Sequence, residues 1–346
     1  MSILKQRYNI TPQMKIYDEF TVDFESYTMF FNKKLFNSKI VNTDELGFRY
    51  NFFNNKMHSF TSLIEEHNEF SLIVGGSTVF GFGATGDDKT ISSLLTKKSE
   101  NLFLNFGATA FNSKQELILF INNFTKLKKI KKVIIISGVN DLYLNIMNNT
   151  ENNNFFFKNN YLLANNLYKI RNNISKKILY LFYKFKNDKF INPNELVFKD
   201  LFKKKKTKSI PDYLNKNMMV SNYNQVFGVW SSLSQKFEFE VSYFFQPLAG
   251  WLNKEFHKSE KDLFNILDNS NDFSHNILKK ISLKDNYMAL SSLLKTICKN
   301  HDIKFYDLNE ELSSICNEND HLFVDRVHLT DYGYELISKI ILNKFK

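Results

Sequence analysis

The sequence has few of the residue types that build metal sites, disulfide frameworks or membrane spans. Its 346 residues include two cysteines, Cys298 and Cys316, with no CxxC motif and no adjacent histidine pair. This spacing predicts buried thiols rather than a zinc site. No stretch approaches the roughly 20 apolar residues of a membrane span, and the basic start lacks the apolar core of a signal peptide. We therefore expect a cytoplasmic protein with no metal and no integral membrane segment.

Glycine is also scarce, and its distribution divides the chain. Eight of the eleven glycines lie between Gly47 and Gly138, and none occurs in residues 139–227. Apolar residues at helical spacing over residues 167–182 predict helices within this glycine-free stretch. We expect a helical insertion at about residues 148–235, either as a cap over a crevice or as a helix for a partner or a membrane surface.

The excess of positive charge is not accompanied by a nucleic-acid motif. The chain carries 46 Lys and Arg against 36 Asp and Glu, a formal net charge of +10. A basic balance suits anionic partners, but this sequence has no dense arginine cluster, so we interpret the charge as a solvated surface and predict no nucleic-acid binding. The glycine-containing stretch at residues 81–88 lacks the Lys-Ser/Thr ending of a P-loop. We expect it to form a wall of the active site, and we predict no cofactor.

A regular alternation of short apolar runs and helical patterns begins at residue 70. Fully apolar runs such as residues 133–136 are typical of central strands in a parallel sheet. Strands are predicted at residues 72–74, 103–106, 133–136, 237–245 and 303–306. Helices are predicted at residues 91–98, 112–128, 287–298 and 331–345. The alternation predicts an α/β protein, a three-layer α/β/α sandwich with a mainly parallel sheet.

A serine follows the first predicted strand directly. The run ends in Gly75, Gly76 and Ser77, which predicts a tight turn before a helix. The carboxyl ends of parallel strands border the crevice where open α/β sheets bind ligands, so Ser77 is a candidate nucleophile. A serine hydroxyl needs a base and a third group that orients this base.

The base and the orienting acid are predicted near the end of the sequence. Asp325 and His328 lie three residues apart in FVDRVHLTDYG, just before the last predicted helix. Asp307, which follows the last predicted strand, is a rival for the role of the acid. A Ser, His and Asp set of this kind is typical of nucleophilic acyl transfer.

Four sequence blocks together resemble the SGNH hydrolases, the superfamily of GDSL-type esterases and lipases. The blocks stand in the family's order and are GGSTVFG with Ser77, NFGATAFNS with Gly107, GVND with Asn140, and DRVH with Asp325 and His328. The match covers residues 70–145 and the chain from about residue 238 onward. One departure is glycine instead of aspartate at Gly76, which resembles a GGS branch of the superfamily.

The resemblance implies a mechanism and a fold. Ser77 would be the nucleophile, His328 the base and Asp325 the orienting acid, with an oxyanion hole made of the Ser77 and Gly107 backbone N–H groups and the Asn140 side chain. The sheet would have the flavodoxin-like order of SGNH hydrolases. Asp325 is preferred over Asp307 because it stands three residues before His328, as in the family.

Two further residues are predicted to contact the substrate. Arg49 lies beside a predicted turn in residues 41–51, and Gln246 ends the fourth predicted strand. Both have structural alternatives, since Arg49 can pair with a carboxylate of the protein and Gln246 can be a capping residue. We expect residues 1–67, which are rich in aromatics, to pack as an extension on a hydrolase-like domain of residues 68–346.

The predicted function is ester hydrolysis through an acyl-serine, on short acyl groups such as acetyl esters of carbohydrate. An O-acyltransferase that modifies a sugar or polysaccharide remains open, because the sequence does not say whether water or an alcohol accepts the acyl group. A third hypothesis is a non-catalytic binding protein on a hydrolase fold. Only the missing aspartate at Gly76 favours that hypothesis.

Overall fold

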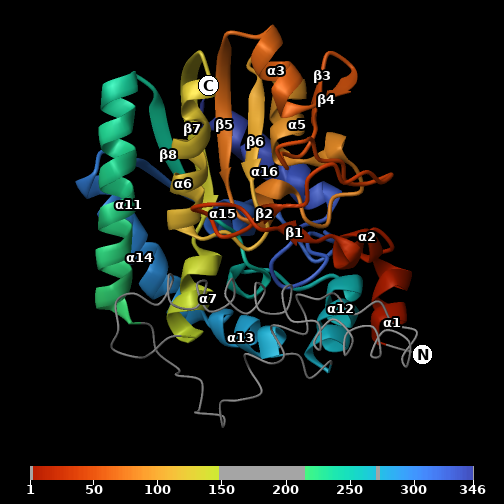
Figure 1. Cartoon of the computed structure of the whole chain (residues 1–346). Helices are drawn as coiled ribbons and strands as arrows, with labels where there is room; N and C mark the ends of the chain where they lie inside the picture. Colours follow the sequence, from red (N-terminus) through yellow and green to blue (C-terminus); the bar gives the residue numbers. More distant parts are fainter. Residues whose placement is uncertain (1–2, 148–214, 270–272, 346) are drawn as a thin grey trace, which may run out of the picture.

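A five-stranded sheet lies at the centre of the computed structural model, which describes residues 3–147, 215–269 and 273–345 (Figure 1). Every neighbouring pair of its strands is parallel. In spatial order the strands are β6 (Phe103–Gly107), β5 (Glu69–Gly75), β7 (Lys129–Ser137), β8 (Glu240–Phe245) and β9 (Lys304–Asp307). With the strands numbered along the chain, this is the flavodoxin-like order 2-1-3-4-5. The predicted mainly parallel sheet is confirmed.

The apolar strand residues alternate between two hydrophobic clusters, one on each face of the sheet. In β5, Leu72 and Val74 belong to one cluster and Ile73 to the other. Such strands are buried on both faces, which explains why they are apolar without a polar alternate. The faces are covered by helices, which completes the three layers of the predicted sandwich (Figure 1).

Among the described residues, six helices form the two outer layers. On the face of Leu72 lie α6 (Ser113–Asn123), α11 (Lys216–Phe237) and α14 (Lys284–Asn300). On the face of Ile73 lie α5 (Ile91–Lys98), α15 (Leu308–Ile315) and α16 (Asp331–Asn343). Beyond the carboxyl ends of the strands lie α7 (Val139–Met147), α12 (Lys258–Asp268) and α13 (Phe273–Ile281) (Figure 1). Single turns are α4 (Ser77–Phe80), η1 (Asp87–Lys89), η2 (Phe124–Lys126) and η3 (Ala249–Trp251).

The described residues before the sheet form a set of short elements packed on it. They are α1 (Ile3–Ile10), α2 (Met14–Glu19), the paired strands β1 (Val22–Asp23) and β2 (Phe31–Asn32), the paired strands β3 (Asn51–Phe53) and β4 (Lys56–His58), and α3 (Phe60–Glu66). Phe48 and Phe60 join the hydrophobic cluster on the Leu72 face. Phe20 packs against Phe80 and Val324, so this segment also reaches the carboxyl edge of the sheet.

Most of the predicted helical insertion, residues 148–214, lies outside the described residues. Its remaining part belongs to α11, which packs against α6 and α14 and buries Tyr223 and Trp230. Residues 216–235, which the prediction included in the insertion, thus complete the outer layer of the sheet with their apolar face. The strand predicted over residues 237–245 begins only at Glu240. Helix α11 continues to Phe237 and ends where Glu238 adopts a left-handed conformation with φ 55°.

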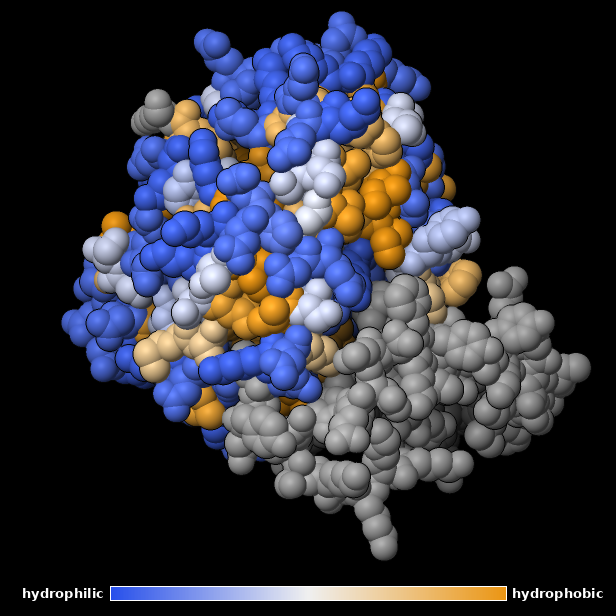
Figure 2. Space-filling model, turned by 90° about the vertical axis from the view of Figure 1, so that its left-hand side faces the viewer, coloured by the Kyte–Doolittle hydropathy of each residue, from blue (hydrophilic) through white to orange (hydrophobic). Residues whose placement is uncertain are grey.

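Figure 2 shows the side of the molecule that carries α11. This side is largely hydrophilic, with separate hydrophobic groups among the charged and polar side chains. The exposed large apolar residues of α11 are Val220, Val229 and Phe237. Within the described ranges, no helix combines the length and the apolar character needed to cross a membrane.

Gly107, the last residue of β6, occupies a position that admits no side chain. A Cβ atom there would collide with the backbone nitrogen of Phe80 in α4. Gly107→Ala should lower the free energy of unfolding by about 2–3 kcal/mol, because α4 or β6 must shift to make room. Urea unfolding followed by circular dichroism measures the change.

Gly228→Ala is the matched control. Gly228 lies inside α11, where a Cβ atom would make an ordinary contact of 3.4 Å with the His301 ring. Alanine favours helix over glycine by about 0.5–1 kcal/mol, so this variant should be unchanged or more stable. Equal destabilisation by both substitutions would contradict the packing explanation.

Candidate active site

Ser77 lies at a sharp turn between β5 and the one-turn helix α4. Gly76 precedes the helix with φ −82° and ψ −149°, and Gly81 ends it in the left-handed region at φ 91°. The next strand on one side of β5 is β6 and on the other side β7, so the strand order reverses here. Such a reversal is the topological switch point at which open α/β sheets bind ligands. The turn therefore places Ser77 at the switch point, where open α/β sheets generally bind ligands.

Glycine at position 76 allows another polar side chain to approach the turn. A Cβ atom on Gly76 would lie 2.8 Å from Nδ2 of Asn140 and 3.2 Å from the carbonyl oxygen of Phe111. Asn140 Nδ2 donates a hydrogen bond of 2.7 Å to this carbonyl. An aspartate side chain at position 76 would displace the Asn140 amide. The departure from the Gly-Asp-Ser pattern is thus matched by the local packing.

Ser77, His328 and Asp325 lie in one hydrogen-bonded line. Oγ of Ser77 is 2.7 Å from Nε2 of His328, and Nδ1 of His328 is 2.8 Å from Oδ2 of Asp325. Ser77 and His328 are 251 residues apart in the sequence. In this arrangement the imidazole can take the serine proton on one nitrogen while the carboxylate orients the other.

Asp325 is held in its charged form. Its Oδ1 accepts the backbone N–H groups of Val327 and His328, each at 2.8 Å, and its Oδ2 lies 3.6 Å from Nη2 of Arg7. Burial alone would raise the pKa of this carboxyl, but the charge and hydrogen bond of His328 and the charge of Arg7 outweigh it. The pKa of Asp325 is therefore well below its usual range, and the carboxylate can stabilise a protonated imidazole.

The ring of Phe82 covers His328, with a centroid distance of 4.5 Å and an interplanar angle of 36°. Phe82 belongs to the stretch at residues 81–88 that was predicted to form a wall of the site. Its backbone N–H donates to the Ser77 carbonyl at 2.9 Å, and its own carbonyl accepts the Tyr334 hydroxyl at 2.7 Å. These contacts connect the wall to both the nucleophile turn and α16.

Gly107 is not placed as the sequence predicted. Its backbone N–H donates to Oδ1 of Asn105 at 2.9 Å, and its carbonyl accepts a hydrogen bond from Asn32. Gly107 is also covered by the backbone of α4. We therefore correct its assignment: the N–H of Gly107 is already used inside the strand and is not available for an oxyanion.

The loop that follows Gly107 offers another donor. The N–H of Ala108 bonds to Gly75, that of Thr109 to Asn32, and that of Phe111 to Ala108. In the part of the chain that the structure describes, the Ala110 N–H has no protein partner. Ala110 is exposed and adopts a left-handed conformation with φ 60°. No sequence signal marks this residue, because its conformation results from the loop around it.

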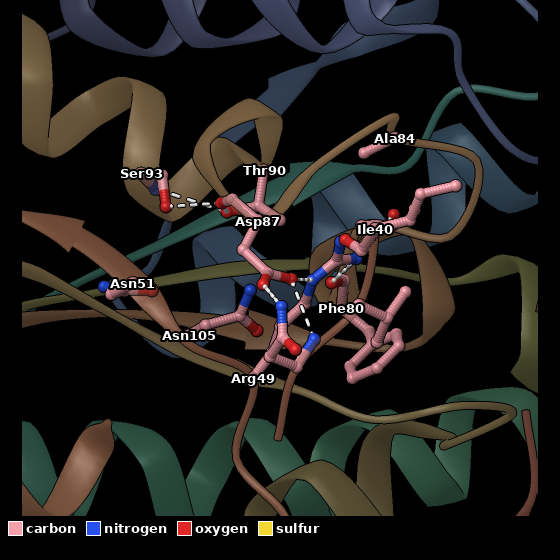
Figure 3. Close-up of polar contacts among 12 residues, drawn as sticks. Ile40, Arg49, Asn51, Phe80, Ala84, Asp87, Thr90, Ser93 and Asn105 are labelled. Atoms are coloured by element: carbon pink, nitrogen blue, oxygen red, sulfur yellow. Dashed lines mark hydrogen bonds and ion pairs between the residues drawn. The ribbon is translucent and has the colours of Figure 1, made fainter. Parts of the chain in front are cut away.

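Arg49 is fully buried and is not placed to contact a substrate, contrary to the prediction. Its Nε donates to Asp87 Oδ1 at 2.7 Å, and its Nη1 donates to the carbonyl oxygens of Phe80 and Gly81 at 2.9 and 2.8 Å. Its Nη2 donates to the Ile40 carbonyl at 2.9 Å. Figure 3 shows the guanidinium pointing into this cluster of acceptors. Arg49 therefore fixes the carboxyl end of α4, the helix that begins with Ser77.

Gln246 is likewise buried and has its polar groups paired within the protein. Its Nε2 donates to Thr78 Oγ1 at 2.7 Å, its backbone N–H donates to the Ser137 carbonyl, and its carbonyl accepts from Asn309. The predicted contact with substrate is therefore replaced by a contact with the residue after Ser77. Asp307, the rival acid, accepts the hydroxyls of Tyr287 and Ser291 and takes no part in the triad line.

The buried Glu116 and the half-buried Asp141, which follows Asn140, each accept hydrogen bonds from a serine. Glu116 of α6 accepts the Ser137 hydroxyl at 2.7 Å, and Asp141 accepts the backbone N–H and hydroxyl of Ser113. Burial raises the pKa of both, and the charge of Asp141 raises that of Glu116 further. Among the described residues, no group of three His, Cys, Asp or Glu side chains is arranged as a metal site.

Comparison with known proteins finds similarity in solved structures. No family model matches the chain, and no curated protein sequence matches it. An acetyl xylan esterase has 10% identity and a TM-score of 0.40, over 80% of this chain and 98% of that chain. A GDSL-like lipase from Bacteroides thetaiotaomicron has 12% identity and a TM-score of 0.41, over 82% and 94%. The lipase/acylhydrolase from Enterococcus faecalis has 10% identity and a TM-score of 0.39, over 80% and 95%.

Removal of the Arg49 charge should destabilise the protein strongly. Arg49→Met leaves the Asp87 carboxylate buried without its ion-pair partner and removes hydrogen bonds from two carbonyls of the serine turn. Breaking a buried pair from one side costs about 3–5 kcal/mol, which should appear as a lower urea midpoint. Lys89→Met, which removes the exposed pair to Asp88, is the control and should change stability by less than about 1 kcal/mol. Similar losses of stability in both variants would refute the conclusion that Arg49 fixes the carboxyl end of α4.

The buried Glu116 predicts a pH dependence of stability. Its pKa is raised in the fold, whereas the unfolded chain loses this proton near the ordinary glutamate pKa of 4.5, so wild-type stability should fall as the pH rises above that value. Glu116→Gln keeps an acceptor for Ser137 without a titrating proton. Its stability relative to wild type should rise by roughly 1–2 kcal/mol between about pH 5 and 8, measured by urea unfolding.

Glu69→Gln serves as the control for this pH series. Glu69 is exposed, and the hydrogen bonds of Lys129 and Lys131 lower its pKa to about 2. It is charged in both the folded and the unfolded chain over the tested range, so its removal should leave the pH slope unchanged. An unchanged slope in Glu116→Gln would mean that Glu116 is ionised in the fold.

Proposed function

We propose that this protein is a serine-dependent ester hydrolase of the SGNH type that works through an acyl-serine intermediate. The observation that carries the proposal is the line from Ser77 through His328 to Asp325, with contacts of 2.7 and 2.8 Å between buried or half-buried groups. The same contacts are the main argument against a non-catalytic binding protein, since a disabled fold has no need for an aligned base.

The reaction begins when Ser77 Oγ attacks the carbonyl carbon of the ester. His328 Nε2 takes the hydroxyl proton, and Asp325 stabilises the resulting imidazolium through Nδ1. The tetrahedral intermediate collapses as the C–O bond to the alcohol breaks, and His328 returns its proton to the leaving alcohol. Water then attacks the acyl-serine with His328 again as the base, which releases the carboxylic acid and regenerates Ser77.

The negative charge on the carbonyl oxygen needs hydrogen-bond donors at the serine turn. The Ser77 N–H lies at the start of α4 and, among the described residues, has no acceptor. Asn140 Nδ2 uses one hydrogen for Phe111, which leaves the other for the substrate. We assign the third donor to the Ala110 N–H in place of that of Gly107.

Short acyl esters of carbohydrate are the proposed substrates. The aromatic side chains of Phe24 and Tyr27 are exposed at 67% and 77% and offer apolar area to sugar rings. They belong to a segment that is hydrogen-bonded to α6 and to the loop after Gly107. The Thr28 carbonyl accepts from the Gln115 side chain, and the Asn32 side chain accepts from the Thr109 N–H. The protein should therefore release acetate from acetylated oligosaccharides faster than from acetate esters of simple alcohols, which lack a ring to contact these aromatics.

The chemistry is tested with p-nitrophenyl acetate and a Ser77→Ala variant. Loss of the nucleophile should lower kcat by roughly 10⁴-fold or more. Asn140→Ala should lower kcat by about 10²- to 10³-fold with a smaller change in KM, because one oxyanion donor is lost. Ser234→Ala, on the outer helix α11, is the matched control and should keep wild-type activity.

A fluorophosphonate probe and an acceptor sugar complete the test. The probe should label wild type and not Ser77→Ala, as shown by mass spectrometry of the labelled peptide. Formation of free acetate in the absence of any sugar indicates hydrolysis. If the acetyl group is transferred only to an added sugar and no free acetate forms, the protein is an O-acyltransferase. A protein that hydrolyses no ester and takes up no probe at Ser77 would refute the proposal.

A further inference from the structure

Arg7, on the first helix of the chain, lies beside the catalytic line. Its side chain is 8% exposed, and its Nη2 is 3.6 Å from Oδ2 of Asp325. Its Nη1 is fixed by both oxygens of Asp18 in α2, each at 2.9 Å. The triad residues come from α4 and the loop before α16, so α1 is a third, separate element at the site.

The oxygen next to Arg7 is the one that His328 uses. Oδ2 of Asp325 accepts the imidazole Nδ1–H at 2.8 Å, while Oδ1 is occupied by the backbone N–H groups of Val327 and His328. The guanidinium and the imidazole therefore share one carboxylate oxygen. A fixed positive charge there reduces the attraction that the carboxylate exerts on a protonated imidazole.

Packing alone does not account for Arg7. Within the described residues its buried Nε has no hydrogen-bond partner, which is a cost for a buried donor. The contact with Asp325 is longer than a hydrogen bond, so it acts through charge. Asp18, which accepts the Tyr8 hydroxyl as well, keeps the guanidinium in place.

We propose that Arg7 is a positioning residue of the active site. It holds Asp325 in place, and its positive charge makes protonation of His328 less favourable. This inference rests on the proposed function. It makes α1 part of the catalytic apparatus, with Asp18, Arg7, Asp325, His328 and Ser77 in one continuous series of polar contacts. The base then stays free to accept the serine proton at lower pH than it would without Arg7.

The other charged groups around His328 are already paired with protein partners. The ring itself contacts Ser77, Asp325 and the uncharged Phe82. Arg326 pairs with Asp268 of α12, and Asp331 at the start of α16 accepts from Thr85. Lys254 pairs with Glu260, which also holds the backbone before Asp325. The variants below change none of these groups.

The test compares pH profiles of kcat/KM for p-nitrophenyl acetate in wild type and in Arg7→Met. The acid limb reports the protonation of the free enzyme's base. It should move up by about one pH unit in Arg7→Met, so that activity falls roughly tenfold at low pH and less than twofold near pH 9. Arg7→Lys keeps the positive charge, so its acid limb should lie close to that of wild type, with only a small upward shift. Lys15→Met, an exposed cation of α2, should leave the profile unchanged.

A double variant separates the effect of Arg7 on Asp325 from that of an uncompensated Asp18. Arg7→Met with Asp18→Asn leaves the net charge of the site unchanged. The acid limb should still move up by at least about half a unit. An unshifted limb in this variant, or equal shifts in Arg7→Met and Lys15→Met, would overturn the proposal.

Histidine titration by NMR makes the result independent of catalysis. In ¹⁵N-histidine-labelled Ser77→Ala protein, the signals of His328 are identified by their loss in His328→Gln. The pH at which His328 takes up its proton should rise in Arg7→Met by the same amount as the acid limb. If wild type hydrolyses no ester, the proposed function fails and this titration still decides the role of Arg7. If circular dichroism shows that Arg7→Met is unfolded, the smaller upward shift of the His328 titration expected in Arg7→Lys decides the role of Arg7.

Discussion

The buried guanidinium of Arg49 is the constraint on which the nucleophile turn depends. A charge in the protein interior is tolerated only when it is paired and hydrogen-bonded. Arg49 meets this condition by joining the Asp87 carboxylate, the Ile40 carbonyl and the last carbonyls of α4. Helix α4 has four residues, too few to be stable by itself. The position of Ser77 is thus maintained by the segment before the sheet rather than by the helix that carries it.

Contacts between uncharged groups also hold the site in place along the carboxyl edge of the sheet. Gln246 after β8 holds Thr78, Asn105 of β6 holds the Val79 carbonyl, and Phe82 covers the histidine. The strands β6 and β8 thus each contribute a side chain, at or just after their carboxyl ends, that holds the serine turn. A preorganised site of this kind loses little free energy in arranging its groups for the reaction.

Local patterns in the sequence were enough to predict most of the fold. The apolar runs of β5, β6 and β7 and the helical spacing of α5 and α16 gave the correct elements, because strands buried on both faces have little choice of composition. Ser77 and His328 could also be selected as site candidates, since serine after a glycine turn and histidine three residues after aspartate are short-range patterns. The structure brings these residues together, and their roles are the proposal made above.

The residues that were placed wrongly or missed depend on contacts that no local sequence pattern shows. The pairing of Arg49 with Asp87 could not be recognised from the sequence, because Asp87 is 38 residues away and belongs to no motif. Arg49 was therefore kept as a candidate for substrate binding. Gly107 was misassigned because its N–H is captured by Asn105, a contact two residues away that the strand pattern conceals. Arg7 stands 318 residues before Asp325. Helix α11 was included in the insertion because helical spacing does not say what a helix packs against.

The distance of 251 residues between the nucleophile and its base has a consequence for the growing chain. At about 5–20 residues per second, Ser77 is synthesised roughly 10–50 seconds before His328. During that interval the serine has no imidazole to remove its proton and remains an ordinary, unreactive alcohol. Ser77 gains its hydrogen bond to His328 only when the loop before α16 has closed on the turn, so the order of synthesis itself delays activation of the hydroxyl until the fold is nearly complete.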